Sequence, residues 1–239
     1  MPRSMNFPSL KRLVALVVVA VSAAAQAQYV NTLNGMQFNN IYAANADFML
    51  SQMIQSASWK SLRQIADNTK NAQGKPPAAP VKKATWQFAL NATDFKPAGA
   101  RQVPEQIAAG VKDPNERKQL VDLCRTILSA LESQPDVRKN NLAMGLTVLL
   151  GASLQVVAQR ELNDAESEEL LRTINDTLAT LDGFKKMDPA GRTRAYDAFM
   201  ITGGLIAGMA EAGKDDPAAA KAAATLAVST LQQFGLLAK

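Results

Sequence analysis

Three Asp-Pro pairs mark helix starts in the second half of this 239-residue chain. An aspartate can cap the first backbone N–H groups of a helix, and proline fits the first helical position because no N–H is needed there. The pairs are Asp113-Pro114, Asp188-Pro189 and Asp216-Pro217. Asn163, with Glu166 three residues later, has the spacing of a capping box and marks a fourth start. From Pro104 onward the pattern predicts one helix after another.

Glycines predict where these helices end, since a left-handed residue often follows the last helical turn. Gly183, Gly213 and Gly235 stand at such places, and Leu231 and Leu236 flank the last of them with the spacing of a Schellman motif. Starts and stops together predict five principal helices, at about 114–134, 138–160, 164–182, 189–212 and 217–234, and a short one near 104–111. The expected fold is an all-α bundle of about five principal helices with an N-terminal helix-plus-linker arm.

Two of these helices are expected in the middle of the bundle. The stretches Asn140–Gln159 and Ala198–Ala210 contain no charged residue, and a helix that is apolar on most sides is buried on most sides. Gly203-Gly204 and Gly208 predict a close crossing of the two helices, with Gly145, Gly151 and Ala152 as the facing small residues. The alternative is a membrane-inserting hairpin, in which Gly204 and Gly208 form a GxxxG motif. Ala198–Ala210 is shorter than the roughly 20 residues that a membrane span needs.

The first 27 residues have the features of a cleaved secretion signal. Arg3, Lys11 and Arg12 precede the uncharged run Leu13–Ala25, and Ala25-Gln26-Ala27 supplies small residues at the cleavage positions. The mature chain is expected to begin at Gln28 and to be periplasmic or secreted. A retained membrane anchor is the alternative, although the apolar run is short for one.

The mature chain is expected to consist of an arm (residues 28–82) and a bundle domain (residues 83–239). In the arm, a helical pattern starts near Ala44 and fades by Asn68, with Leu50, Ile54, Ala57, Leu62 and Ile65 on one face. Asn71–Pro80 is a linker by composition, because Pro76-Pro77 prevents helix continuation. Trp86, Phe88 and Leu90 then alternate, which predicts a short extended segment laid on a hydrophobic surface.

The positive charge of the chain is concentrated before the bundle. Of 26 Lys and Arg residues, three belong to the expected signal, so 23 remain against 21 acids and the mature net charge is +2. Residues 60–101 have a net charge of +6 and residues 102–239 a net charge of −3. This balance argues against a nucleic-acid partner, which would need a clustered basic face. The basic linker with Trp86 could instead bind an anionic polymer or a membrane surface; the alternative is that it provides solubility and reach.

The chain contains no histidine and one cysteine. Without histidine, Ser-His-Asp and Cys-His catalysis and His-ligated metal sites are excluded. Cys124 shares a helical face with Leu120, Ile127 and Leu131, so we expect it to be a small buried hydrophobic residue; an exposed cysteine paired between chains is the alternative. No metal site, cofactor, phosphate-binding loop or nucleophile motif is predicted.

Four residues near the start of helix 189–212 form the densest polar cluster beside an apolar helix: Arg192, Arg194, Tyr196 and Asp197. As a binding site they would offer an arginine pair and a tyrosine hydroxyl to an anion. The alternative is a solvated helix start, with Arg194 and Asp197 spaced for a surface ion pair. No acid stands inside an apolar pattern, where a raised pKa would be expected.

A run of residues before the bundle resembles a known family. Thr93–Arg101 (TDFKPAGAR), continuing through Val103-Pro104 and Ile107-Ala108 and followed by the helices through Gly203-Gly204-Leu205, is similar to an uncharacterised family of exported bacterial proteins, a domain of unknown function. The resemblance covers about residues 85–235. It implies export and an all-helical domain, and it carries no activity.

These observations favour a non-catalytic exported protein of the bacterial cell envelope that binds a protein or another envelope component. An enzyme is not expected. The alternatives are a membrane-active helical protein and a carboxylate-dependent hydrolase, because acids are plentiful in the chain. The ligand and the oligomeric state do not follow from the sequence.

Overall fold

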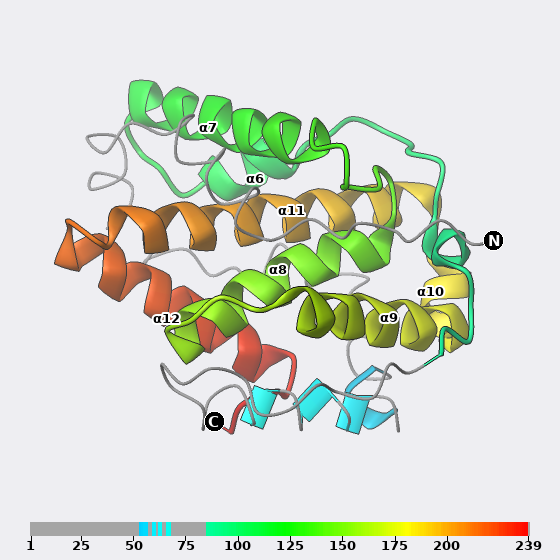
Figure 1. Ribbon diagram of the computed structural model, residues 1–239. Coiled ribbons are helices and arrows are strands. Elements are labelled where there is room, and N and C mark those ends of the chain that lie inside the picture. The colour runs from blue at the N-terminus through cyan, green and yellow to red at the C-terminus, as the bar shows by residue number, and fades with distance from the viewer. Residues whose placement is uncertain (1–52, 57–58, 61, 64–65, 68–84, 239) are drawn as a thin grey trace.

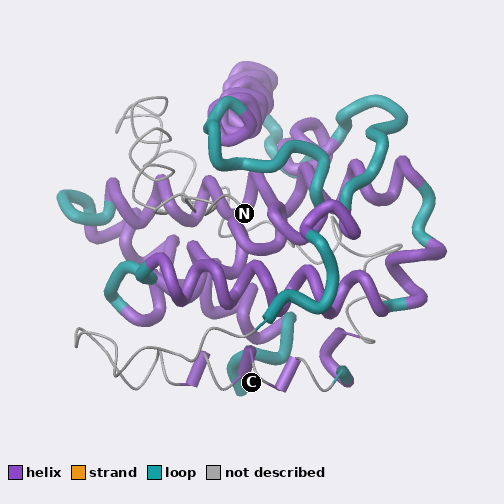
Figure 2. The backbone as a smooth tube through the Cα atoms, turned by 45° about the vertical axis from the view of Figure 1, so that its right-hand side comes forward, coloured by secondary structure: helices purple, strands orange, loops and turns teal. Residues whose placement is uncertain are grey.

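The computed structural model describes residues 53–56, 59–60, 62–63, 66–67 and 85–238. Within these residues the chain is helical, and no strand is drawn in Figure 2. The elements are the 3-10 helix η1 (Leu90–Thr93) and the α-helices α6 (Val103–Ala108), α7 (Pro114–Glu132), α8 (Leu142–Ala158), α9 (Asp164–Thr180), α10 (Asp182–Lys186), α11 (Pro189–Ala212) and α12 (Pro217–Gln233). The predicted all-α bundle is confirmed, and the five principal helices correspond to α7, α8, α9, α11 and α12.

The two apolar helices form the centre of the bundle. Helices α8 and α11 lie against each other, and α12 packs against both. Helix α7 covers α11 on one side, with α6 against α7, and α9 covers α8 on the other side (Figure 1). Every residue from Leu142 to Leu154 is buried, which explains why this stretch carries no charge: an ionised side chain there would lose its hydration.

Glycine brings the central helices close together. A Cβ at Gly203 would lie 2.9 Å from the backbone of Leu149 on α8, so a larger residue would push the helices apart. Gly145 on α8 faces the ring of Tyr196 on α11, where a Cβ would lie 3.0 Å from the ring. The predicted close approach of the two helices is present at Gly203, but this glycine faces the backbone of Val148 and Leu149 and not the small residues that were expected opposite it. Gly204, however, faces α7, where a Cβ would collide with the side chain of Ile127.

The predicted helix starts are confirmed, and one of the predicted ends has the expected conformation. Asp113, Asp188 and Asp216 each accept a hydrogen bond from a backbone N–H in the following first turn, and Asn163 with Glu166 forms the capping box. Gly235 is left-handed, with φ of 62°, and the N–H of Leu236 donates to the carbonyl of Leu231 at 2.8 Å. Gly213 ends α11 with a right-handed φ of −63°, so the prediction of a left-handed residue there is wrong.

Two helix boundaries also differ from the prediction. The expected helix 164–182 is two helices, because Leu181 is buried in an extended conformation and α10 begins after it; Gly183 therefore lies inside α10. Helix α8 begins at Leu142 instead of residue 138, because Asn140 is left-handed and Asn141 caps the helix by accepting from the N–H of Met144 at 2.8 Å.

The segment that precedes α6 is held by hydrogen bonds to side chains of α9. Both carboxylate oxygens of Asp176 accept from backbone N–H groups, those of Gln87 and Phe88, each at 3.1 Å. The prediction of an extended segment laid on a hydrophobic surface through Leu90 is therefore wrong in two respects. The ring of Phe88 is exposed, and the chain coils into η1 at Leu90.

The described residues of the predicted arm pack into the same hydrophobic core as the bundle. Met53, Trp59, Leu62 and Ala66 are buried. The indole Nε1 of Trp59 donates to the carbonyl of Phe234 at 2.7 Å, and the two rings lie 6.3 Å apart. Leu62 and the half-buried Ile54 belong to the predicted apolar face. The division into residues 28–82 and 83–239 stays a prediction, but these contacts tie the two parts together.

Several predicted features lie outside the described residues: the signal at 1–27, Leu50, Ala57 and Ile65 of the arm, and the linker at 71–80. Cys124 is described. It is fully buried, as predicted, and burial is the main reason that the pKa of its thiol is raised to about 12. Among the helices that the structure describes, none is both long and apolar enough to cross a membrane.

Candidate functional site

The four residues that the sequence grouped at the start of α11 separate into two environments. The guanidinium of Arg192 donates to the backbone carbonyls of Phe184 and Lys185 and lies 4.5 Å above the ring of Phe184. Arg194 is exposed. Tyr196 and Asp197 are completely buried. The structure therefore does not assemble an arginine pair with a tyrosine donor.

The predicted surface ion pair between Arg194 and Asp197 is absent from the described part of the chain. Asp197 lies two helical turns before Gly204 on the same face of α11, and this face contacts α7. The carboxylate of Asp197 lies near the side chain of Arg101, which comes from the loop before α6. The Arg101 Nε atom lies 3.6 Å from Asp197 Oδ1. That distance allows an ion pair but is too long for an N–H···O hydrogen bond.

Arg101 links the buried carboxylate to a second acid at the surface. Its Nη2 atom donates to Glu132 Oε1, at the end of α7, at 2.7 Å. The side chains of Arg101 and Glu132 are 36% and 16% exposed, and that of Asp197 is 0% exposed. Arg101 thus lies between Asp197 and the solvent. We call Arg101, Glu132, Tyr196 and Asp197 the buried acid cluster.

The electrostatics of this cluster favour a protonated Asp197. The pKa of Asp197 is raised to about 7: desolvation by burial is the largest cause, the charge of Arg101 opposes it, and the charge of Glu132 adds to it. Neither carboxylate oxygen has a hydrogen-bond partner among the described residues, so the ion pair with Arg101 offsets only part of the lost hydration of the ionised form. The expectation that no acid stands within an apolar pattern is therefore wrong, because Asp197 directly precedes the uncharged stretch of α11 and is enclosed with it.

Tyr196 is as buried as its neighbour Asp197. Its ring packs edge-on against Phe95, with 5.6 Å between centroids, and it fills the space that Gly145 leaves. Burial is the largest reason that the pKa of its hydroxyl is raised well above the ordinary range, and the backbone of Asn140 opposes this shift. The buried part of the cluster thus consists of Tyr196 and Asp197, while Arg101 and Glu132 form its partly exposed side.

A separate cavity of about 820 Å³ opens between α8, α11 and α12. Its floor is formed by small apolar side chains: Ala152, Val156, Ala207, Ala210, Ala223 and Ala224. Its rim is polar and is formed by Gln155, Gln159, Arg160, Glu161, Glu211 and Lys214. We call this cavity the α8–α11–α12 groove.

The charges at the rim of the groove are largely neutralised within the protein. Arg160 donates to both carboxylate oxygens of Glu166, at 2.9 and 2.7 Å, and Lys214 pairs with Glu211 at 2.5 Å. Two buried donors remain unpaired within the described residues, the Nε2 atom of Gln155 and the Nε atom of Arg160. The groove can therefore offer hydrogen bonds to an uncharged ligand above an apolar floor.

The groove and the buried acid cluster are different places. Asp197 lies ten residues before Ala207, the first groove residue on α11, a distance of about 15 Å along the helix axis. No group of three potential metal-ligating side chains comes together in the regions that the structure covers.

The comparison with protein families gives a match over nearly the whole chain. The model of a family of unknown function, DUF6683, matches residues 9–238. The chain belongs to this family. A search of curated proteins and a search of solved structures each found no match.

The family match is wider than the resemblance drawn from the sequence. It includes the predicted arm as well as residues 85–235, so both parts are features of one family. This agrees with the packing of Trp59 against Phe234 across the two parts. The family description assigns no activity, and any function must be argued from the sites themselves.

Arg101 and Glu132 are the members of the cluster that the sequence did not indicate. In the sequence, Arg101 contributes only to the charge of residues 60–101 and to the Thr93–Arg101 run, and nothing singles out Glu132. A usable signal was the spacing of Asp197 and Gly204, seven residues apart and so on one helical face. That spacing predicts that Asp197 faces the same neighbouring helix as the glycine. It does not predict which loop supplies the cation.

Proposed function

We propose that this protein is a non-catalytic, exported binding protein of the bacterial cell envelope, and that its ligand occupies the α8–α11–α12 groove. The observation that carries the proposal is the cavity of about 820 Å³ with an apolar floor and a polar rim. Sites for small molecules usually have volumes of roughly 300–1,000 Å³ and combine an apolar lining with a few polar groups. The two unpaired N–H donors favour a ligand that carries hydrogen-bond acceptors.

The export part of the proposal rests on the N-terminal sequence. Arg3, Lys11 and Arg12, the apolar run and the Ala25-Gln26-Ala27 pattern are typical of a cleaved signal. The intact mass of protein recovered from the cell envelope should correspond to a chain that begins at Gln28. A full-length chain that resists extraction from membranes by carbonate would contradict export and release.

Binding is favoured over hydrolysis because the acid with the raised pKa does not reach the groove. Asp197 is 0% exposed and lies about 15 Å along α11 from the first groove residue. Two carboxylates line the groove, Glu161 and Glu211, and Glu211 is paired with Lys214. A carboxylate-dependent hydrolase would need an acid with a raised pKa in contact with its substrate, to serve as the proton donor.

The test is the binding of N-phenyl-1-naphthylamine, an uncharged amphipathic dye whose fluorescence rises in apolar sites. We expect saturable binding at one site by the purified protein. Ala224→Trp should fill the groove from the exposed side of α12 and abolish this binding. Ala218→Trp, on the same helix but outside the groove, is the matched control and should bind as the parent does. Equal binding by both variants would contradict the assignment of the groove.

A further inference from the structure

One end of the bundle gathers basic side chains from four segments of the chain. Residues 94–99 and 138–141, helix α10 and the first turns of α11 meet there. The backbone N–H of Phe95 donates to the carbonyl of Asn140 at 2.9 Å, and that of Ala98 donates to Thr193 Oγ1 at 3.0 Å. We call the basic side chains of these segments the basic end: Lys96, Arg138, Lys139, Lys185, Lys186, Arg192 and Arg194.

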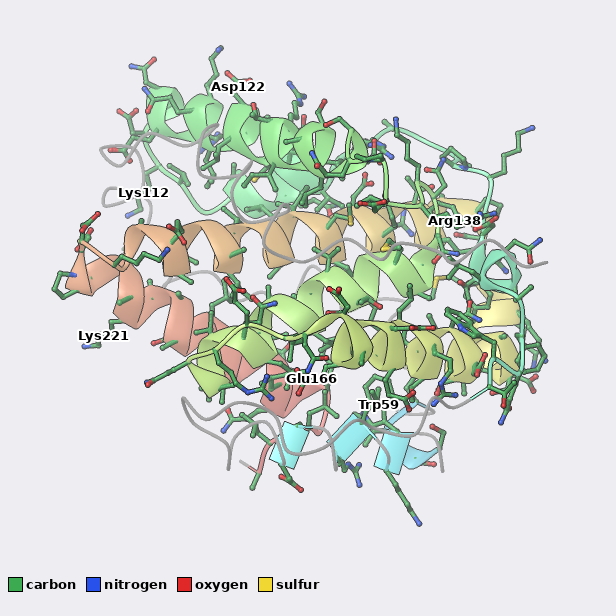
Figure 3. The ribbon with its side chains drawn as sticks, in the orientation of Figure 1. Trp59, Lys112, Asp122, Arg138, Glu166 and Lys221 are labelled. Carbon is green, nitrogen blue, oxygen red and sulfur yellow. The ribbon has the colours of Figure 1, made fainter. Side chains whose placement is uncertain are left out.

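The basic end is unlike the rest of the bundle in charge. Its segments, 94–99, 138–141 and 182–194, contain seven basic and three acidic residues, a net charge of +4. The remainder of residues 102–239 contains nine basic and sixteen acidic residues, a net charge of −7. Figure 3 shows Arg138 at one end of the molecule, and Lys112 and Lys221 toward the other.

Two of the three acids at the basic end accept hydrogen bonds within the protein. Asp94 accepts from Nε of Arg138 at 2.7 Å and from its Nη2 at 2.5 Å, and Asp188 caps α11. Four cations remain without a hydrogen-bond or ion-pair partner among the described residues: Lys96, Lys139, Lys186 and Arg194. All four are exposed. This free positive charge is therefore available to an external anion.

An exposed aromatic ring accompanies these cations. Phe88 is 37% exposed, and only Val228 is comparable among the large hydrophobic residues that the structure describes. The backbone around Phe88 is fixed, because its N–H donates to Asp176 and its carbonyl accepts from Asn175. These anchors are on the second half of α9, which leads through Leu181 into α10. The backbone of Phe88 is thus anchored on the part of α9 that leads into α10 and the basic end, and its ring is partly exposed.

We propose that the basic end and Phe88 together bind the surface of a bilayer that contains anionic lipids. Lysine and arginine attract anionic headgroups, and an aromatic side chain partitions into the interface beneath them. A soluble polyanion would use the cations but would gain little from a fixed, exposed phenyl ring, so the lipid surface accounts for both observations. The association is peripheral, and it is independent of the ligand in the α8–α11–α12 groove.

The experiment is flotation of the purified protein with phosphatidylcholine vesicles, with and without phosphatidylglycerol. We expect binding only to the anionic vesicles, with loss of binding at high salt because surface charges are screened. Lys139→Gln with Lys186→Gln should weaken partitioning about 25-fold, at about five-fold per cation. Lys112→Gln with Lys221→Gln removes the same charge at the opposite end and should leave partitioning nearly unchanged. All four side chains are exposed, so folding should be kept.

A second pair of variants tests the contribution of Phe88 to membrane binding. Phe88→Ser should weaken partitioning about five-fold or more, since an apolar ring is withdrawn from the interface, whereas Val228→Ser should have no effect. Three results would overturn the proposal: equal binding to neutral vesicles, equal losses in the matched variants, or binding to heparin without binding to vesicles. The last result would identify a polyanion site in place of a lipid surface.

Discussion

Asp176 on α9 and Asp197 on α11 are both buried aspartates, but their surroundings differ. Asp176 accepts hydrogen bonds from the backbone N–H groups of Gln87 and Phe88, and from Arg172 Nη1 at 3.2 Å. Asp197 accepts none from the described residues and has Arg101 at 3.6 Å. A buried carboxylate that accepts hydrogen bonds from the backbone holds that segment of chain in place. A buried carboxylate without donors has a raised pKa, because its ionised form has lost its hydration. The first acid is therefore structural, and the second is poised to change its charge near neutral pH.

The largest expected effect is on the pH dependence of stability through Asp197. Its pKa in the folded protein is about 7, above the ordinary value of 3.8. The folded state therefore holds a proton that the unfolded state releases, and stability falls as pH rises from about 4 to about 7. The full difference is about 4 kcal/mol. The chain has no histidine, so no other side chain has an ordinary pKa within the upper part of this range.

Asp197→Asn should remove this dependence, because asparagine resembles the protonated acid in shape and cannot ionise. We expect the variant to be more stable than the parent at pH 8 by up to about 4 kcal/mol, and to have similar stability at pH 4.5. Urea denaturation at a series of pH values measures both. If the stability of the parent protein did not change between pH 4.5 and 8, Asp197 would not differ from Asp176 in the way proposed.

Asp176→Ala should lower the stability of the protein, whereas Asp197→Asn should raise it. Removing this carboxylate leaves two backbone N–H groups and the Nη1 atom of Arg172 without their acceptor, although Arg172 keeps Glu169, and this should cost on the order of 3 kcal/mol. Because the N–H groups of Gln87 and Phe88 lose their hydrogen bonds in this variant, their amide hydrogens should also exchange faster. Asp122→Ala removes an exposed acid paired with Lys118 and serves as the control, with no measurable change expected. Equal effects in both variants would show that Asp176 does not hold the segment.

Arg101→Met should produce a smaller effect, a shift in the pH dependence of stability that Asp197 causes. Arg101 lowers the pKa of Asp197, so its removal should move the midpoint of the stability curve to higher pH. Methionine keeps the apolar cover over the carboxylate while removing the charge. A midpoint that moves to lower pH would mean that solvent enters the cluster when the arginine is removed.

Glu132→Gln should give the smallest shift, in the opposite direction. The charge of Glu132 raises the pKa of Asp197, so neutralising it should move the midpoint to lower pH. The amide oxygen of glutamine can still accept from Arg101, which keeps the arginine in place. Comparison of this variant with Arg101→Met in the same denaturation series tests the sign of each charge. Shifts of the same sign in both variants would refute the assigned roles.

The contrast between the two aspartates also shows how far the sequence could predict this molecule. Helix starts such as Asp113, Asn163 and Asp188 are local features, because a cap and its partners lie within three residues of each other, and these predictions are confirmed. The central helices could be predicted for a similar reason, since burial on all sides excludes charge from their sequences. The break at Leu181 could not, because the extended conformation of this buried residue has no local signal in the sequence.

The buried acid cluster depends on three segments that are far apart in the chain. Arg101, Glu132 and Asp197 come from a loop, the end of α7 and the middle of the bundle, and no periodicity relates them. The short spacing between Arg194 and Asp197 suggested a surface pair, but that inference placed both residues on the exposed side of α11. The close contact at Gly204 turns the Asp197 face toward α7, and this tertiary fact decides the chemistry of the acid.

The most direct test is the carboxyl 13C chemical shift of Asp197, followed by NMR as pH is raised from 4 to 9 in protein labelled at aspartate and assigned with Asp197→Asn. The account predicts a single titration with a midpoint near 7, while the folded state persists. A midpoint in the ordinary range for aspartate, near about 4, would contradict it, because the carboxylate would then be hydrated or hydrogen-bonded in the folded protein.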